Sequence, residues 1–335
     1  MGCEITEGLT LDKVREYIDL ELDEFYLENL RQKHGIASTC KPFYVAISRL
    51  LQDRKIKRVG RGYYRKVKQV EPVQWWNNTN ETPIEGFRFP QSHTDGTKFG
   101  IEDLVEIFPG DFILIGGVSN YGKTALVMNI IGENIDLMPI QVMGNEYTAA
   151  DGKISPKFKR RLDKMSWVKW LDDDSQPRFT LLPVDSDYED YIRQDALNAV
   201  DWISLPGEYY LIDRVMKAMK DKVGYGLLVG VLQKDRLKEW AEGGERIERH
   251  ADIYLKIDPC GDESLLTIGK VKAPKSRVLG RMWGFKIVDY GANLSGIHEV
   301  IKCNKCNGFG KNYGKKCAAC NGMGYRDKEE YEHDV

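Results

Sequence analysis

The chain has 335 residues, 42% of them hydrophobic and 30% charged, a balance typical of globular proteins with roughly two or three domains. No apolar run approaches the roughly 18 residues that a membrane-spanning helix needs, so that class is excluded and we expect no membrane partner. The formal net charge is −2, but residues 1–30 hold nine acids against two bases, and residues 31–70 hold twelve bases against one acid. The basic block suits a polyanionic partner.

The N-terminal part predicts helices followed by a basic hairpin. Apolar residues recur at helical spacing over residues 11–30 and again over residues 42–54, and residues 56–67 read as two short strands around a glycine turn. This order resembles the winged helix, a DNA-binding module, and the alternative is a small protein-docking domain. The resemblance implies DNA contacts from five bases of the predicted recognition helix and wing: Lys41, Arg58, Arg61, Arg65 and Lys66.

The expected domain organisation follows from changes in composition. Residues 1–70 are expected to form acidic helices followed by the winged-helix-like basic module. Residues 71–98, rich in Pro, Gly and Asn, are interpreted as a linker with Trp75 and Trp76 packed against a neighbour. Beyond them we expect three parts: an α/β domain over residues 99–300, a cysteine unit over residues 301–326 and an acidic tail over residues 327–335.

A glycine loop breaks an apolar run within residues 111–129. Gly117, four further residues and then Gly122, Lys123 and Thr124 match the Walker A pattern of a P-loop, between a predicted strand and a predicted helix. The glycines bring backbone N–H groups close to phosphate oxygens, Lys123 bridges the outer phosphates, and Thr124 offers a hydroxyl to Mg²⁺. We therefore predict ATP and Mg²⁺ binding here, with contacts from Gly117, Asn120, Gly122, Lys123, Thr124 and Ala125.

Strands and helices alternate from residue 99 to about residue 298, which predicts an α/β fold with a mostly parallel sheet and later antiparallel strands. Polar residues follow several predicted strands, at the edge where such sheets bind ligands. Asp201 is the predicted second magnesium ligand, with Asp185 as the alternative. Glu146 is predicted to orient the attacking water, and Gln233 to sense the γ-phosphate.

Residues 109–115, Glu146 and residues 200–205, 229–233 and 249–255 together resemble the RecA-like ATPase domain of DnaB-family replicative helicases and their phage relatives. The resemblance covers residues 99–290. It implies three roles: catalytic glutamate, Walker B aspartate and coupling glutamine for Glu146, Asp201 and Gln233.

Ring-forming members of that family supply a Lys-x-Arg pair to the γ-phosphate of a neighbouring subunit. Lys270 and Lys272 occupy the place of this pair, so the resemblance implies a homo-oligomer, either a ring or a filament. Lysine lacks the planar fork of arginine, which leaves Arg277 or Arg281 as the alternative source of this charge.

Residues 234–249 form a mixed-charge stretch with a double glycine. In RecA-like ATPases the corresponding loop lines the DNA path, which implies phosphate contacts from the bases of this stretch. These are Lys234, Arg236, Lys238 and Arg246. The alternative is a solvated loop whose bases pair with its acids.

Four of the seven cysteines form two Cys-x-x-Cys pairs: Cys303, Cys306, Cys317 and Cys320. Their spacing predicts one structural Zn²⁺ with four thiolate ligands, and their concentration in one span suits a reducing, cytoplasmic location. The repeated Cys-x-x-Cys-x-Gly-x-Gly pattern resembles the DnaJ-type zinc domain. Six bases, no acids and several aromatic residues in this unit favour nucleic acid as its partner, with protein as the alternative.

The expected function is an ATP-hydrolysing, DNA-acting motor of the helicase type in DNA replication. One alternative is a DNA-binding ATPase switch, such as a recombination mediator or helicase loader, that does not unwind DNA processively. Another is a nucleic-acid-binding scaffold in which nucleotide binding has only a structural role.

Overall fold

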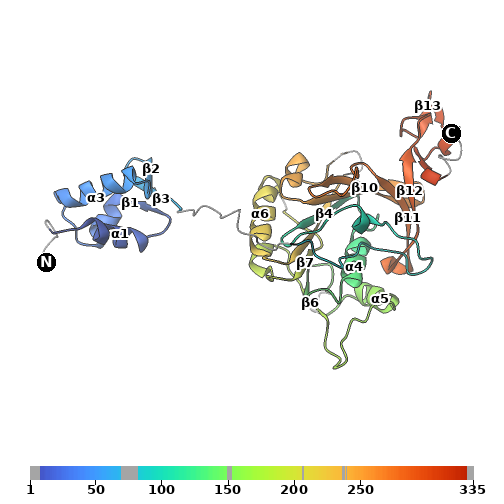
Figure 1. Ribbon diagram of the computed structural model, residues 1–335, viewed down its shortest axis with the longest axis horizontal. Helices are drawn as coiled ribbons and strands as arrows, with labels where there is room; N and C mark the ends of the chain where they lie inside the picture. Colours follow the sequence, from blue (N-terminus) through green and yellow to red (C-terminus); the bar gives the residue numbers. More distant parts are fainter. Residues whose placement is uncertain are drawn as a thin grey trace. The chain divides into compact units, whose positions relative to one another are not determined.

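The computed structural model describes residues 8–68, 82–148, 153–205, 207–235, 238 and 240–329. They belong to two compact units, Met1–Thr79 and Asn80–Val335 (Figure 1). Trp75, Trp76 and Arg236 lie outside the described residues. In the described ranges, no helix has both the length and the apolar character needed to cross a bilayer.

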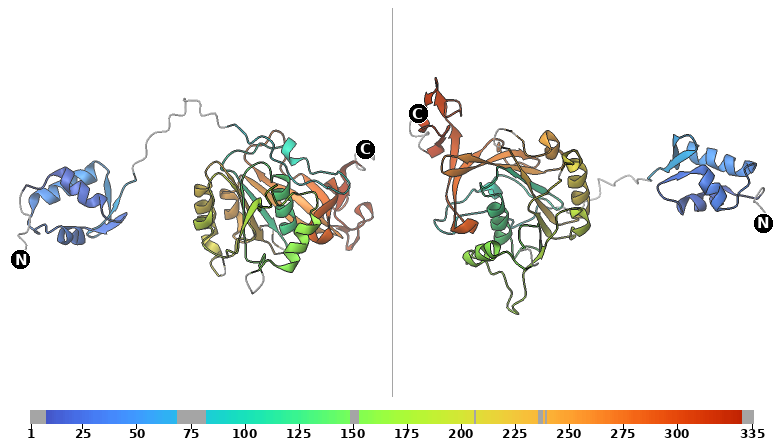
Figure 2. Two further views of the ribbon diagram at one scale, coloured as in Figure 1. Left: turned by 90° about the horizontal axis from the view of Figure 1, so that it is seen from below. Right: turned by 180° about the vertical axis from the view of Figure 1, so that it is seen from behind.

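The N-terminal unit folds around one apolar core. Its elements are α1 (Leu11–Asp19), β1 (Glu24–Tyr26), α2 (Leu27–Lys33), α3 (Lys41–Gln52), β2 (Ile56–Gly60) and β3 (Tyr63–Lys66). The hydroxyl of Thr10 caps α1 by accepting from the backbone N–H of Lys13 at 3.2 Å. The apolar faces of α1 and α3 share this core, and the three strands form an antiparallel sheet in the order β1-β3-β2 (Figure 2).

Residues 82–98, which we predicted to be part of the linker, pack on the larger unit. Phe87 and Phe89 are buried in its core. The side chain of Asn134 accepts from the backbone N–H of Arg88 at 2.9 Å and donates to its carbonyl at 2.8 Å. The lack of periodicity correctly predicted an irregular backbone in this segment. The segment nevertheless packs on the larger unit and is not a linker, because side chains such as that of Asn134 satisfy its backbone polar groups.

A ten-stranded mixed sheet forms the larger unit, in the order β15-β12-β11-β10-β9-β4-β8-β7-β5-β6. Six parallel strands occupy one side of it: β4 (Phe112–Gly117), β5 (Ile140–Met143), β6 (Phe179–Leu182), β7 (Leu197–Val200), β8 (Leu227–Gln233) and β9 (Ile253–Cys260). The rest is antiparallel: β10 (Glu263–Val271), β11 (Met282–Val288), β12 (Asn293–Lys302) and β15 (Tyr325–Asp327). The mixed α/β class predicted from the alternation of elements is therefore confirmed.

Helices cover both faces of the parallel strands (Figure 1). On one face, Ile113 and Ile115 of β4 share a core with α4 (Lys123–Glu133) and α5 (Pro156–Lys164). On the other face, Phe112 and Leu114 share a core with α6 (Ile212–Lys222). Successive side chains of β4 thus enter two different cores, which explains why this strand is an unbroken apolar run.

The cysteine unit is continuous with the sheet. β12 extends to Lys302, and β15 returns beside it, so the ends of the predicted 301–326 unit are sheet strands. Between them lies the segment that we call the knuckle, residues 303–324, with a small hairpin of β13 (Lys311–Asn312) and β14 (Lys315–Lys316). It projects from the end of β12 (Figures 1 and 2). Residues 330–335 of the predicted tail lie outside the described residues.

Candidate functional site

A cavity of about 470 Å³ lies at the carboxyl ends of β4, β7 and β8. Eight of the residues predicted for nucleotide or magnesium chemistry line it: Asn120, Gly122, Lys123, Thr124, Ala125, Glu146, Asp201 and Gln233. Gly117 ends β4 next to this cavity, and a Cβ atom there would lie 3.1 Å from the side chain of Lys123. Residues that are far apart in the sequence therefore meet at one edge of the sheet.

The loop between β4 and α4 has a backbone that only a few residue types adopt. Asn120 has a φ of 66° and Gly122 a φ of 97°, both in the left-handed region, where glycine and asparagine are tolerated best. Gly122 is also the N-cap of α4, and no side chain caps the helix there. The first N–H groups of α4 are thus available at the cavity, where the helix dipole favours an anion.

Lys123 is 9% exposed and points back over this loop. Its ammonium group donates to the carbonyl oxygen of Val118 at 3.0 Å. Burial lowers the pKa of Lys123, and the negative charges of Asp201, Glu146 and Glu242 oppose that lowering. A nearly buried ammonium group at a cavity suits a negatively charged ligand.

Asp201 follows the end of β7 and is 4% exposed. Its carboxylate accepts hydrogen bonds from the hydroxyl of Tyr147, at 2.8 Å, and from the hydroxyl of Thr124. Burial raises the pKa of Asp201, and these hydrogen bonds oppose the increase. The alternative Asp185 is exposed and does not line the cavity, so Asp201 is the one that lies beside Thr124.

Sequence reasoning missed the contribution of α5. Lys157 and Arg161 line the cavity from this helix, and the guanidinium of Arg161 donates to the carbonyl of Tyr290 at 3.1 Å. Burial lowers the pKa of Arg161, and the negative charges of Asp201 and Glu146 oppose that lowering. Lys157 and Arg161 are spaced i, i+4, which places both bases on one face of the helix. This spacing was the sequence signal that could have identified them.

Lys270 and Lys272 do not line this cavity. Lys272 forms an ion pair with Asp252 at 2.7 Å, and Lys220 binds the same carboxylate. Asp252 accepts from the backbone N–H of Phe112, at the other end of β4 from the glycine loop. Lys270 donates to the carbonyl of Glu248. Their proposed action on a neighbouring subunit stays a prediction, because it needs a second copy of the chain.

The alternative sources of that charge differ in their surroundings. Arg281 is held by Glu299 through two hydrogen bonds of 2.8 and 2.7 Å, an arrangement that fixes the guanidinium within its own chain. Arg277 is exposed. Neither arginine lines the cavity described above.

The predicted DNA contact at Lys234 is wrong. This side chain is 5% exposed and forms an ion pair with Asp258. It follows β8 directly, and its backbone N–H still bonds to the carbonyl of Gly117, so it belongs to the sheet rather than to a surface loop. Lys238 pairs with Asp235 at 2.7 Å, as the solvated-loop alternative expects, whereas Arg246 is exposed.

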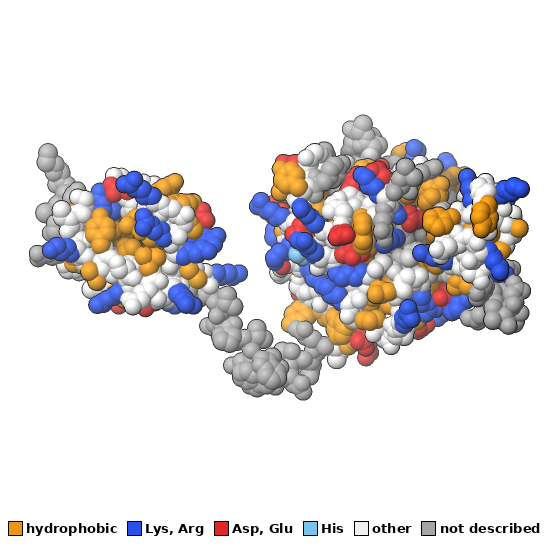
Figure 3. All heavy atoms as spheres, turned by 90° about the horizontal axis from the view of Figure 1, so that it is seen from above, with side chains coloured by type: hydrophobic (Ala, Val, Ile, Leu, Met, Phe, Trp, Pro, Cys, Tyr) orange, Lys and Arg blue, Asp and Glu red, His pale blue; other side chains and the backbone are white. Residues whose placement is uncertain are grey.

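Three of the five bases predicted to contact DNA in the N-terminal unit, namely Lys41, Arg58 and Arg61, are exposed. Arg65 is half-buried, 3.9 Å from Glu24. Lys66 instead donates to the carbonyls of Asp19 and Glu21, at 3.1 and 2.6 Å, which fastens the hairpin to the end of α1. Figure 3 shows Lys and Arg side chains around an apolar patch on this unit.

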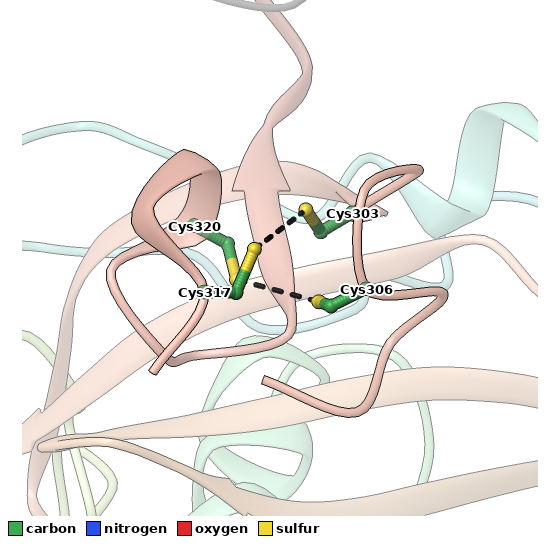
Figure 4. Close-up of side chains that lie close together, drawn as sticks. All are labelled: Cys303, Cys306, Cys317 and Cys320. Atoms are coloured by element: carbon green, nitrogen blue, oxygen red, sulfur yellow. Dashed lines mark hydrogen bonds between the residues drawn. The ribbon is translucent and has the colours of Figure 1, made fainter. Parts of the chain in front are cut away.

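The four cysteines of the knuckle form a compact, buried cluster (Figure 4). Their sulfur atoms all lie within 4.8 Å of one another, with Cys303 to Cys317 at 3.9 Å and Cys306 to Cys320 at 3.6 Å. A tetrahedral ion with Zn–S bonds of 2.3 Å has S–S edges of about 3.8 Å. The four thiols could therefore hold a metal ion such as zinc.

Comparison with models of known protein families finds no match, and no curated protein matches the chain in sequence. Its function must therefore be argued from the geometry of the sites.

Proposed function

We propose that this protein is an ATP-hydrolysing, DNA-acting motor with a RecA-like P-loop core, a winged-helix-like N-terminal unit and a structural zinc ion. The observation that carries the proposal is the cavity at the carboxyl ends of β4, β7 and β8. It gathers a lysine and a threonine from the glycine loop with acidic and amide residues from three other segments. This is the set of groups that ATP hydrolysis requires.

The glycine loop provides the phosphate site in this proposal. The N–H groups at the start of α4 and the ammonium of Lys123 would bind the phosphate oxygens of ATP. Thr124 and Asp201 already share a hydrogen bond, and their oxygens would hold Mg²⁺. When bound, Mg²⁺ would neutralise charge on the phosphate oxygens.

Hydrolysis needs a group that orients water and a positive charge for the transition state. Glu146 is exposed at the cavity and can accept a hydrogen bond from the attacking water. Arg161 and Lys157 of α5 line the same cavity and can stabilise the developing negative charge from within the same chain. Gln233 ends β8 and lines the cavity, where it would sense the γ-phosphate and report its presence to the following loop.

The N-terminal unit would supply binding to duplex DNA. Its order of helix, strand, two helices and hairpin supports the winged-helix interpretation, with α3 as the recognition helix and β2 and β3 as the wing. The bases Lys41, Arg58 and Arg61 are exposed and suit contact with phosphates.

A DNA-binding ATPase switch is the second candidate. One observation favours it: Lys272, the residue expected to act on a neighbouring subunit, is paired with Asp252 of its own chain. A switch that takes its catalytic charge from Arg161 would not need a ring.

A strand-displacement assay separates the two candidates. Full-length protein is mixed with ATP and a duplex that has a single-stranded tail. The motor predicts that the strands separate with ATP and stay paired with a non-hydrolysable analogue. DNA-stimulated ATP turnover without displacement would indicate the switch, and ATP binding without turnover would contradict both.

A further inference from the structure

The knuckle is built from two similar halves, residues 303–310 and 317–324. The same backbone hydrogen bonds recur in each half. These are Gly308 to Cys303 (3.3 Å) and Phe309 to Cys306 (3.0 Å) in the first half, then Gly322 to Cys317 (3.0 Å) and Met323 to Cys320 (2.9 Å) in the second. A Cβ atom at Gly310 would lie 2.3 Å from the carbonyl oxygen of Gly322, so the two halves meet backbone to backbone. This close approach joins the two halves into one compact platform.

Large apolar side chains stand on the outside of this platform. Phe309 and Met323 occupy equivalent positions in the two halves and are 79% and 47% exposed, and Tyr313, between β13 and β14, is 99% exposed. The buried cluster of the knuckle consists of its four cysteines alone. These apolar side chains therefore contribute little to folding, and their exposure favours a role in binding.

Lysines flank Tyr313 on both strands of the hairpin. Lys311 lies directly across from Lys316 in the hairpin, and Asn312 across from Lys315. Like charges that face each other across strands destabilise a hairpin. Residues 301–326 contain no acid, and the described part of the chain shows no ion pair to Lys305, Lys311, Lys315 or Lys316. Figure 3 shows apolar and basic side chains side by side at this end of the larger unit. A polyanion would relieve the repulsion.

We propose that the knuckle binds single-stranded nucleic acid, with Phe309 and Tyr313 stacking on bases and the lysines contacting phosphates. Exposed rings beside a basic surface form the usual single-strand platform. A duplex keeps its bases stacked on one another and could use only the lysines. An acidic protein could likewise use the lysines, but its carboxylates offer no flat surface for the two rings. This surface lies outside the nucleotide cavity and acts without ATP.

The test compares two strands of equal charge by fluorescence anisotropy. Full-length, zinc-loaded protein without ATP is titrated into labelled oligothymidylate of about 16 nucleotides and into an abasic strand of the same length. The proposal predicts that the base-containing strand binds at least about 5-fold more tightly, from stacking. The double variant Phe309→Ala, Tyr313→Ala should lose this preference and still bind the abasic strand as wild type does.

Two further variants complete the test. Tyr225→Ala removes a ring that is 67% exposed elsewhere in the same unit, and it should leave the preference unchanged. Lys315→Gln with Lys316→Gln should lower the slope of log affinity against log salt by about 1.4, because each lost phosphate contact contributes about 0.7 on single strands. A matching oligouridylate titration distinguishes RNA from DNA as the preferred strand.

Equal affinity of the wild type for the base-containing and abasic strands would overturn the proposal, and would indicate a general polyanion surface. A preference that survives in the double variant would overturn it as well. Zinc content, measured for each variant, shows whether the knuckle remains folded. Should the double variant lose zinc, Tyr313→Ser alone carries the test, because that side chain touches solvent almost entirely. None of these measurements depends on ATP hydrolysis.

Discussion

At the scale of single residues, the cavity brings together ionisable side chains whose charged forms are disfavoured by burial. Burial lowers the pKa of Lys123 and raises that of Asp201, and each residue stabilises the charged form of the other. Tyr147 and Thr124 add hydrogen bonds that favour the carboxylate. The mutual charges and these hydrogen bonds thus favour the ionised forms, which binding of a phosphate and a divalent cation would need.

Arg161 provides the first prediction at this scale. Arg161→Ala should reduce ATP turnover by about 100-fold or more while weakening nucleotide binding much less, because in the proposed mechanism this guanidinium stabilises the transition state. Steady-state turnover and binding of a fluorescent ATP analogue measure the two effects. Lys159→Ala is the control on the same helix, since Lys159 pairs with Asp163 and does not line the cavity. Equal losses in both variants would exclude this role.

Asp111, the residue before β4, provides a pH prediction. Burial, together with the charge of Asp252, raises its pKa from 3.8 to about 6, although the N–H of Phe108 donates to it at 2.8 Å. The folded state therefore binds more protons than the unfolded state between about pH 4 and 6, so this residue lowers stability as pH rises through that window.

Asp111→Asn should remove this effect. Relative to wild type, the variant should gain about 1–2 kcal/mol of stability between pH 4 and pH 7, less than the roughly 3 kcal/mol of a fully buried group with this shift. Urea unfolding followed by tryptophan fluorescence measures the difference at each pH. Asp173→Asn, at an exposed carboxylate, is the control. A difference that does not change with pH would refute the assignment.

At the scale of elements, the sequence predicted the strands and helices around the cavity closely. β4 and α4 flank the glycine loop as predicted, and β7 and β8 end at or just before Asp201 and Gln233, because these elements bury apolar side chains in clearly patterned stretches. The three-residue strand β1 was missed, since such a short segment carries no pattern of its own. The role of α5 was missed too, because Lys157 and Arg161 look like ordinary surface bases until the fold places them beside Thr124.

The hairpin of β2 and β3 gives a prediction at this scale. Replacing Arg58, Arg61 and Arg65 with glutamine should weaken duplex DNA binding and lower its salt slope by up to about 3, because each phosphate contact on duplex DNA contributes about 0.9. Replacing Lys13 and Arg15 on α1 in the same way is the control. Binding is measured by anisotropy at several salt concentrations. An unchanged slope would mean that this unit is a protein-docking domain.

Metal removal tests whether a bound ion keeps the knuckle folded. Its only buried cluster is the four cysteines, so chelation of the proposed zinc should unfold residues 303–324 and release β15 from β12. Hydrogen exchange should accelerate at residues 300–302 and 325–327 and stay slow in β4 and β8. Reconstitution with Zn²⁺ should restore protection. Identical exchange with and without chelator would show that no structural metal is present.

At the scale of the whole molecule, two surfaces accompany the cavity at the carboxyl ends of β4, β7 and β8: the basic N-terminal unit and the knuckle at the end of β12. The chain divides into two units with the boundary at Thr79, so the proposed duplex-binding and nucleotide-binding roles belong to different units. Each role can therefore be removed by mutation without unfolding the other.

The proposed ATPase activity is tested by ATP turnover of the full-length protein. It is measured without DNA, with single-stranded DNA and with duplex DNA, for the wild type and for Lys123→Ala. The account predicts turnover that DNA stimulates in the wild type, and turnover at background in the variant under all three conditions, while the variant still binds duplex DNA through residues 31–70. Turnover by Lys123→Ala equal to that of the wild type, or no turnover by the wild type in any condition, would contradict the account.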